Sequence, residues 1–173
     1  YTSALDATLS PKISTIKAEG SFGMTKSRLK GYPIQMEIAK LLRAKELENI
    51  ALDDWRSDFT IKNEVLTFKN LNITSADIGL QMEGTHQLVS GIINYKATIA
   101  LPSRFKKGME AVLSKQAVEA LEQENGTIAV PLVITGTSDQ PKVRPDKSVI
   151  EDIVKKYLKK KGGDLIKNLF GGN

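Results

Sequence analysis

Hydrophobic and polar residues alternate along the middle of the chain, from about residue 53 to residue 101. A period of two is typical of strands that have one buried face. The short connections between these runs leave no room for helical crossovers, so we expect an antiparallel meander of four or five strands. The apolar positions change parity between Phe68 and Leu71, which predicts a bulge or bend near Asn70.

Three stretches have the spacing of amphipathic helices. The first runs from Ile34, after Pro33, to about Lys45, and the second covers residues 104–123. The third, from about Ser148 to Lys161, separates an apolar stripe from a row of lysines, and we expect Gly162-Gly163 to end it. This stripe is expected to dock on the sheet, while binding to a membrane surface or to a partner stays open as an alternative.

The ends of the sheet are predicted from other signals. Residues 3–30 are expected to be extended, with Gly20 and Gly23 as interruptions. Pro131 has no amide hydrogen, so its strand should lie at a sheet edge or begin a ladder there. Pro141 and Pro145 are expected to form a rigid connector into the last helix.

These elements together predict an α+β fold: an antiparallel, strongly twisted β-sheet with about three packed helices. We expect one domain over residues 1–173, because neither a linker nor a low-complexity region is visible. Aromatic residues make up only 6% of the chain, so aliphatic side chains must fill its core. The sequence starts at Tyr1, in what looks like a strand, so we expect a fragment of a longer protein.

The residue types argue against an enzyme. The chain has no cysteine, which excludes disulfides, zinc–thiolate sites and thiol nucleophiles. His86 is the single histidine and is expected in an exposed loop, with no triad around it. No calcium-loop or phosphate-loop pattern occurs, so we expect neither a metal nor a cofactor.

The net charge of +5 is mildly basic, and the basic runs at 104–107 and 155–161 are expected to be solvated helix faces. The aromatic residues Phe59, Phe68 and Tyr95 alternate with aliphatic residues, as core positions do. We therefore expect no nucleic-acid binding.

Four passages, in this order, resemble the C-terminal region of the AsmA-like family of bacterial envelope proteins. The last of them is the most specific, and in the second Glu64 stands where glycine is common in the family. The passages are Gly31–Ile34 with the helix that follows, Phe59–Leu66, Gly91–Tyr95, and Val130–Thr137 followed by Pro141–Asp146.

The resemblance implies a non-enzymatic protein of the periplasm, whose longer parent is anchored in the inner membrane of a Gram-negative bacterium. It implies a role in phospholipid transport or in outer-membrane assembly and maintenance, with phospholipid, a membrane surface and other envelope proteins as partners. This chain would form the end of a longer β-groove whose apolar face shelters acyl chains. The groove-lining candidates are Leu66, Phe68, Leu80, Met82, Ile92, Tyr95, Ile99 and Leu101.

A structural or interaction module is the alternative. In that case the C-terminal amphipathic helix and its apolar tail bind a partner protein or a membrane surface. The candidates for this contact are Lys155, Lys156, Lys159, Lys160, Leu165, Ile166, Leu169 and Phe170.

Overall fold

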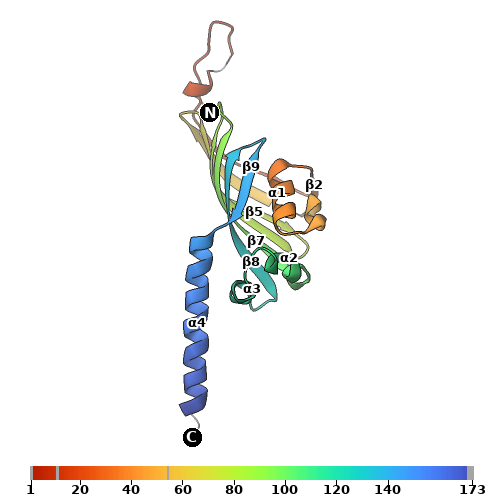
Figure 1. The fold of residues 1–173 in the computed structure, drawn as a ribbon. Coiled ribbons are helices and arrows are strands. Elements are labelled where there is room, and N and C mark those ends of the chain that lie inside the picture. Colours follow the sequence, from red (N-terminus) through yellow and green to blue (C-terminus); the bar gives the residue numbers. More distant parts are fainter. Residues whose placement is uncertain (1, 11, 54, 171–173) are drawn as a thin grey trace.

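The computed structural model describes residues 2–10, 12–53 and 55–170, with side chains up to residue 162. Over these residues the fold is α+β, as the sequence predicts, and a twisted antiparallel sheet of seven strands forms its centre (Figure 1). In sheet order the strands are β1 (Ala18–Met24), β4 (Trp55–Lys62), β5 (Val65–Ser75), β6 (Ile78–Gln87), β7 (Ile92–Pro102), β8 (Thr127–Thr137) and β9 (Pro141–Pro145).

Strands β4 to β8 are neighbours both along the chain and in the sheet, so the predicted meander is confirmed. The predicted bulge is confirmed as well, because the register of β5 and β6 shifts between Phe68 and Leu71. Asn70 adopts a left-handed φ of 54° within this bulge. The extra residue keeps Phe68 and Leu71 on the same face of the sheet.

A second layer lies over part of the apolar face of the sheet. It consists of β2 (Ser27–Lys30), α1 (Pro33–Leu41), a 3₁₀ turn η2 (Lys45–Glu48) and β3 (Asn49–Leu52), and we call it the cover. Strands β2 and β3 pair only with each other among the described residues, as a two-stranded antiparallel sheet.

Helix α1 ends at Leu41, earlier than the sequence suggests. Arg43 takes a left-handed φ of 52°, and the amide of Ala44 bonds back to the carbonyl of Ala39 at 2.8 Å. A residue in this conformation cannot continue a helix, so the chain turns here into η2.

The second predicted helix is not continuous, so the prediction for residues 104–123 is wrong in detail. The segment forms a 3₁₀ turn η3 (Ser103–Phe105), α2 (Lys106–Glu110) and α3 (Lys115–Leu121). Ser114 has extended backbone angles, and its hydroxyl caps α3 by accepting a hydrogen bond from the amide of Ala117 at 3.2 Å. Gly108 lets α2 approach the end of α1, because a Cβ at this position would clash with the carbonyl oxygen of Leu42.

The two proline signals near the C-terminus have different outcomes. The ladder between β8 and β9 begins at Leu132, directly after Pro131, as the missing amide hydrogen predicts. The expected Pro-x-x-x-Pro connector is instead the edge strand β9 itself. An edge strand tolerates proline, because one of its sides needs no hydrogen-bond donors.

Helix α4 (Lys147–Phe170) runs through Gly162-Gly163, so the predicted stop at these glycines is wrong. Its start is capped by Asp146, whose carboxylate accepts hydrogen bonds from the Ser148 hydroxyl at 2.9 Å and the Val149 amide at 3.3 Å. Only its beginning packs on the body, through Ile150 and its neighbours Ile153 and Val154, and the rest projects away (Figure 1). None of the described helices is both long and apolar enough to cross a bilayer.

Candidate functional site: an apolar cavity under the cover

The apolar face of the sheet is divided into two parts, and only one of them is fully packed. On β7 and β8 it lies under α1, α2 and α3, where side chains fill the space between the layers. We call this part the filled half. Its fully buried residues include Leu42, Leu101, Met109, Val118, Ile128 and Val130.

On β4, β5 and β6 the face lies under β2 and β3, and the two layers meet only along part of it. There the Asp53 amide donates to the carbonyl of Thr74 at 3.0 Å, and the Ser75 hydroxyl donates to the carbonyl of Ala51. A partly open cavity of about 400 Å³ lies between the two layers, and we call this part the hollow half. The volume falls in the range of roughly 300–1,000 Å³ that is usual for ligand pockets. The floor of the cavity is formed by Phe68, Leu71, Ile73, Ile78, Leu80 and Met82, and its roof includes Leu29, Ile50 and Leu52 of the cover.

The cavity exists because two neighbouring strands bend away from the sheet at the same point. Met24 at the end of β1 pairs with Trp55 at the start of β4, and Ser27 at the start of β2 pairs with Leu52 at the end of β3. The two paired chain segments that form β1 and β4 therefore leave the sheet between these two pairs and fold back over it as the two-stranded ribbon of β2 and β3. We call this point the bend.

Gln35 holds the cover together from inside. Its side-chain amide donates to the carbonyl oxygens of Leu29 (2.9 Å) and Leu47 (2.7 Å), and its Oε1 accepts from the Tyr32 amide at 3.2 Å. The side chain thereby joins α1 to β2 and to the turn before β3. A buried amide with this many partners fixes the elements of the cover relative to one another.

Exposed apolar side chains border the cavity where it meets solvent. Phe22, Met24 and Tyr32 line it, and they are 38%, 53% and 62% exposed. Phe22 packs edge-on against Trp55, with ring centroids 5.2 Å apart, and lies 6.0 Å from the ring of Phe68. Large apolar residues that stay exposed together beside a cavity are characteristic of a binding surface.

Seven of the eight sequence-predicted groove residues fall into three groups. Phe68, Leu80, Met82 and Ile99 line the cavity together. Tyr95 (4% exposed) and Leu101 (0%) lie on the same face but inside the filled half, and the burial of Tyr95 raises the pKa of its phenol. Leu66 is half-buried on this face, opposite Ile61 and His86, away from the cavity.

The expectation for Ile92 is corrected by the register of β7. The buried positions of this strand begin at Ile93 and recur at every second residue, while Ile92 is 53% exposed on the opposite face. Ile93 therefore takes the place that the sequence assigned to Ile92, because successive side chains of a strand point to opposite faces.

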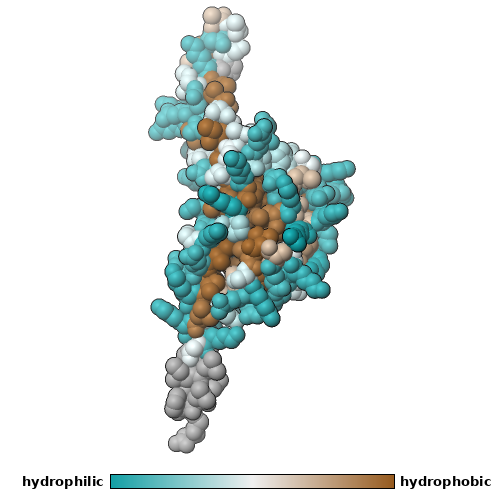
Figure 2. Space-filling model, viewed as in Figure 1, coloured by the Kyte–Doolittle hydropathy of each residue, from teal (hydrophilic) through white to brown (hydrophobic). Residues whose placement is uncertain are grey.

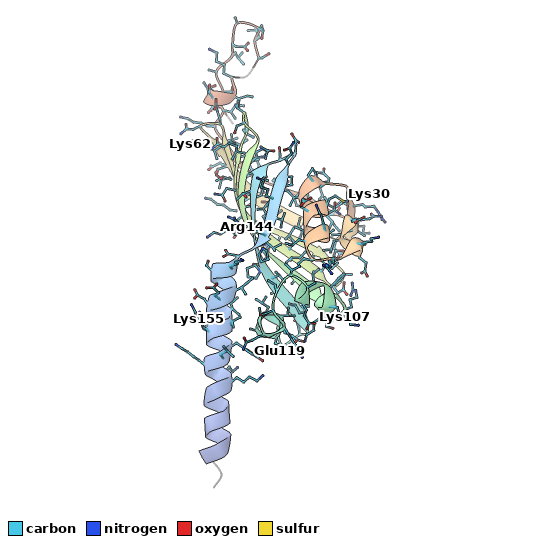
Figure 3. All side chains as sticks on the ribbon, in the orientation of Figure 1. Lys30, Lys62, Lys107, Glu119, Arg144 and Lys155 are labelled. Carbon is cyan, nitrogen blue, oxygen red and sulfur yellow. The ribbon has the colours of Figure 1, made fainter. Side chains whose placement is uncertain are left out.

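The predicted membrane or partner contacts lie on α4. Lys155, Lys156, Lys159 and Lys160 are exposed, and Figure 3 shows Lys155 on the part of α4 that leaves the body. Leu165, Ile166, Leu169 and Phe170 belong to the same helix, but their side chains lie outside the described part of the chain. Figure 2 shows a band of hydrophobic residues that runs from the centre of the molecule onto the upper part of α4, with hydrophilic residues on both sides.

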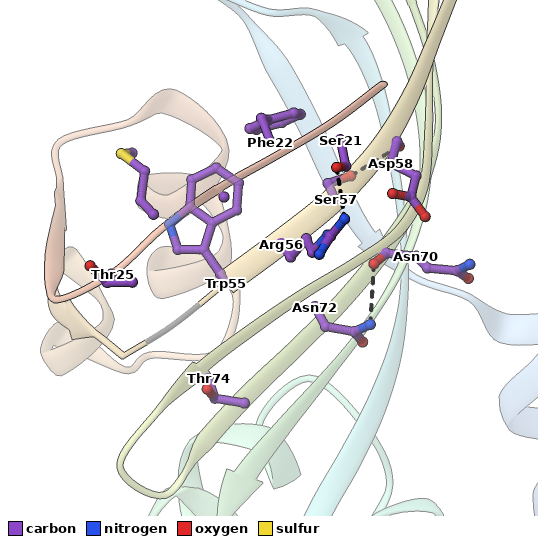
Figure 4. Close-up of a pocket in the computed structure, with 12 residues that line it drawn as sticks. Ser21, Phe22, Thr25, Trp55, Arg56, Ser57, Asp58, Asn70, Asn72 and Thr74 are labelled. Carbon is purple, nitrogen blue, oxygen red and sulfur yellow. Dashed lines mark hydrogen bonds between the residues drawn. The ribbon is translucent and has the colours of Figure 1, made fainter. Parts of the chain in front are cut away.

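A second hollow of about 680 Å³ lies beside β1, β4 and β5 (Figure 4). It is open to solvent, and polar groups that bond to each other line much of it. Arg56 donates to the hydroxyl of Ser21 at 2.8 Å, and the Asn72 amide donates to the carbonyl of Asn70 at 3.1 Å. These pairings occupy part of the polar lining, and the cavity under the cover is less open and far more apolar, so it is the better candidate site.

His86 lies inside β6 and is half-buried, so the expectation of an exposed loop histidine is wrong. The described residues contain no group of three or more histidine, aspartate or glutamate side chains placed to hold a metal ion.

Sequence reasoning missed the residues at the bend. Phe22 and Met24 lie in the stretch that was expected to be extended, but nothing in the sequence shows that the chain folds back over the sheet after Met24. Trp55 and Ser27 could therefore not be placed next to the floor positions of β5 and β6.

Comparisons of this chain with protein-family models, with curated proteins and with solved structures found no match. The AsmA-like assignment therefore stays a prediction from the sequence.

Proposed function

We propose that this protein is a non-enzymatic lipid-binding module whose cavity shelters an acyl chain. The observation that carries the proposal is the cavity of about 400 Å³ between the sheet and the cover, lined almost entirely by aliphatic and aromatic side chains. Each methylene group removed from water into such a lining contributes roughly 0.8 kcal/mol, so one chain of moderate length gives useful affinity.

The charges near the cavity suit the headgroup of an anionic lipid. Lys26, Arg28 and Lys30 are exposed on and beside β2, and Arg28 also borders the cavity. Figure 3 shows Lys30 on the outer side of the cover. A chain in the cavity with its headgroup outside would place an anionic phosphate within reach of these cations.

The cellular role is the broader part of the proposal. In a Gram-negative envelope, a module of this kind serves phospholipid transport or outer-membrane maintenance from the periplasm. β1 lies at the end of the strand order, so a longer β-groove would continue the sheet from its free edge. The family resemblance and the one-sided apolar sheet support this role.

The proposal is tested by lipid binding to the 173-residue protein and to two isoleucine-to-phenylalanine variants. Ile78→Phe extends into the cavity, whereas Ile92→Phe adds the same ring to the exposed opposite face. We expect a fluorescent fatty-acid analogue to bind the unsubstituted 173-residue protein, here called the parent protein, and Ile92→Phe with equal affinity. Its affinity for Ile78→Phe should be at least about tenfold lower. Equal binding by all three proteins, or no binding by any of them, would refute the proposal.

The alternative is an interaction module built on α4. One observation favours it: after its first turns this helix leaves the body and carries exposed Lys155, Lys156, Lys159 and Lys160. Under this alternative, deletion of residues 162–173 abolishes flotation with anionic liposomes. Under the cavity proposal the same deletion leaves binding of the fatty-acid analogue unchanged, so the two readouts separate the two functions.

A further inference from the structure

Two buried polar atoms at the bend have no hydrogen-bond partner in the part of the chain that the structure describes. They are the hydroxyl oxygen of Ser27 and the indole nitrogen of Trp55. Both residues border the cavity. They flank the bend, since Ser27 opens β2 and Trp55 opens β4.

The other buried polar groups of the lining behave differently. Gln35 has three hydrogen-bond partners, and the hydroxyl of Ser75 donates to the carbonyl of Ala51. Buried polar groups in folded proteins almost always have partners, so two exceptions in one lining need an explanation. A ligand in the cavity supplies one.

The chemistry of the two groups defines what they can bind. An indole N–H only donates, and a serine hydroxyl donates or accepts, so together they suit an oxygen atom with free lone pairs. Arg28 is the only charged residue among the described residues that line the cavity. It lies on the exposed side of β2, where it donates to the side-chain oxygen of Asn49 at 3.0 Å. A carboxylate buried at the bend would therefore lack a counter-ion, whereas a neutral carbonyl oxygen would not need one.

We propose that the cavity is specific for acyl esters, and that Trp55 Nε1 and Ser27 Oγ donate hydrogen bonds to the ester carbonyl oxygen while the aliphatic chain fills the space between β5, β6 and the cover. This inference rests on the proposed function and adds the class of ligand and its direction in the cavity. The ester end lies at the bend, next to the exposed side chains of Phe22 and Met24, and so faces the opening.

The first experiment compares three probes: methyl laurate, laurate, and a linear alkane with as many heavy atoms as the ester. Each competes with the fluorescent fatty-acid analogue for the parent protein. We expect the ester to bind about tenfold or more tightly than the alkane, because only the ester satisfies the two donors. We also expect it to bind more tightly than the laurate anion.

Trp55 supplies an independent readout, because it is the only tryptophan of the chain. A ¹⁵N-labelled sample therefore gives one indole N–H resonance. We expect this proton resonance to move downfield when methyl laurate binds, as it does when an N–H begins to donate, and not to do so with the alkane.

Three variants then locate the contact. Trp55→Phe keeps an aromatic ring without the N–H, and Ser27→Ala removes the hydroxyl; each is expected to lower ester affinity severalfold and leave alkane affinity unchanged. Ser75→Ala is the matched control, because its hydroxyl lies in the same lining but already has a partner. It should not change the preference for the ester.

The outcomes separate this inference from the proposed function. Equal affinity for ester and alkane, with an unmoved indole resonance, overturns the ester site but leaves the acyl-chain cavity standing. If laurate binds most tightly of the three probes, the inference that the bend prefers a neutral carbonyl oxygen to a carboxylate is overturned. Failure of all three probes to bind overturns the proposed function itself.

Discussion

The filled and hollow halves of the sheet share one face and one sequence pattern, yet only the filled half is a conventional core. Leu101 and Ile128 are completely buried there, whereas Leu80 and Ile78, on the neighbouring strand β6, are half-buried beside a cavity. The difference lies in what covers them. Helices α1, α2 and α3 insert side chains between those of β7 and β8, while a ribbon of two strands lies over β5 and β6.

An apolar sheet face therefore does not by itself decide between core and binding site. A two-stranded ribbon directs only every second side chain toward the sheet, the bend sets where it leaves the sheet, and Gln35 joins it to α1. The ribbon therefore cannot settle into the remaining space as a helix in contact with the sheet does. The predictions below test this difference between the two halves.

The largest expected effect comes from truncation of matched leucines. Leu101→Ala removes a fully buried side chain from the filled half and should lower the free energy of unfolding by about 3–5 kcal/mol. Leu80→Ala removes the same atoms beside a cavity, where fewer neighbours lose contact, and should lower it by less than about 2 kcal/mol. Urea unfolding of both variants measures the difference, and equal losses would show that the halves are packed alike.

Removal of the Gln35 amide should have the next largest effect. Gln35→Leu has a similar volume but leaves the carbonyl oxygens of Leu29 and Leu47 without their donor, which costs about 2–3 kcal/mol. Because these bonds hold the roof, we also expect weaker binding of the fatty-acid analogue. Glu37→Leu on the same helix serves as the control, because the Glu37 side chain is 40% exposed and pairs only with the exposed Lys40 among the ion pairs of the described residues. A stable Gln35→Leu protein with unchanged ligand affinity would contradict this role.

Enlargement of matched isoleucines tests the same difference with added instead of removed side-chain atoms. Ile128→Phe overfills a closed core and should cost about 1–3 kcal/mol. Ile78→Phe enters empty space, so its free energy of unfolding should stay within about 1 kcal/mol of the parent value while its ligand affinity falls. Thermal unfolding with and without the fatty-acid analogue measures both effects. If Ile78→Phe proves as destabilised as Ile128→Phe, the hollow half is not open to a larger side chain.

The sequence carried enough information for the sheet but not for the cavity. Period-two alternation and the parity change at Asn70 are local signals, and the meander and its bulge follow from them. The burial of Leu101 and the accessibility of Leu80 depend on which later element packs above each strand, and alternation does not encode this. The fold-back at Met24 and the unpaired groups of Ser27 and Trp55 arise only in three dimensions. Ile92 was misplaced because Ile92 and Ile93 are both apolar, so the pattern left the register of β7 ambiguous.

The smallest effect on stability is expected from substitution of Arg104, which forms ion pairs at the end of the hollow half. Its guanidinium forms hydrogen bonds to both carboxylate oxygens of Asp77, in the turn between β5 and β6, and lies 3.3 Å from Glu46 of η2. It thus ties the cover to the sheet. These groups are about half exposed, so Arg104→Gln should change stability little. Without this tie the cover should open more often, so we expect severalfold faster dissociation of the fatty-acid analogue in stopped-flow measurements.

Lys106→Gln is the matched control, because Lys106 pairs with Glu122 at 3.0 Å beside the filled half. It should leave the dissociation rate unchanged.

The pH dependence gives a further check. The hydrogen bond from Arg104 lowers the pKa of Asp77 below its ordinary value of 3.8, so the tie is fully present above that pH and is lost as the pH falls through the lowered pKa. Ligand dissociation from the parent protein should therefore accelerate only below about pH 4, and that acceleration should be reduced in Arg104→Gln, whose tie is already absent. An equal acceleration in both proteins would show that Asp77 does not hold the cover, and the closure of the hollow half would then rest on the bend and on the hydrogen bonds between β3 and β5.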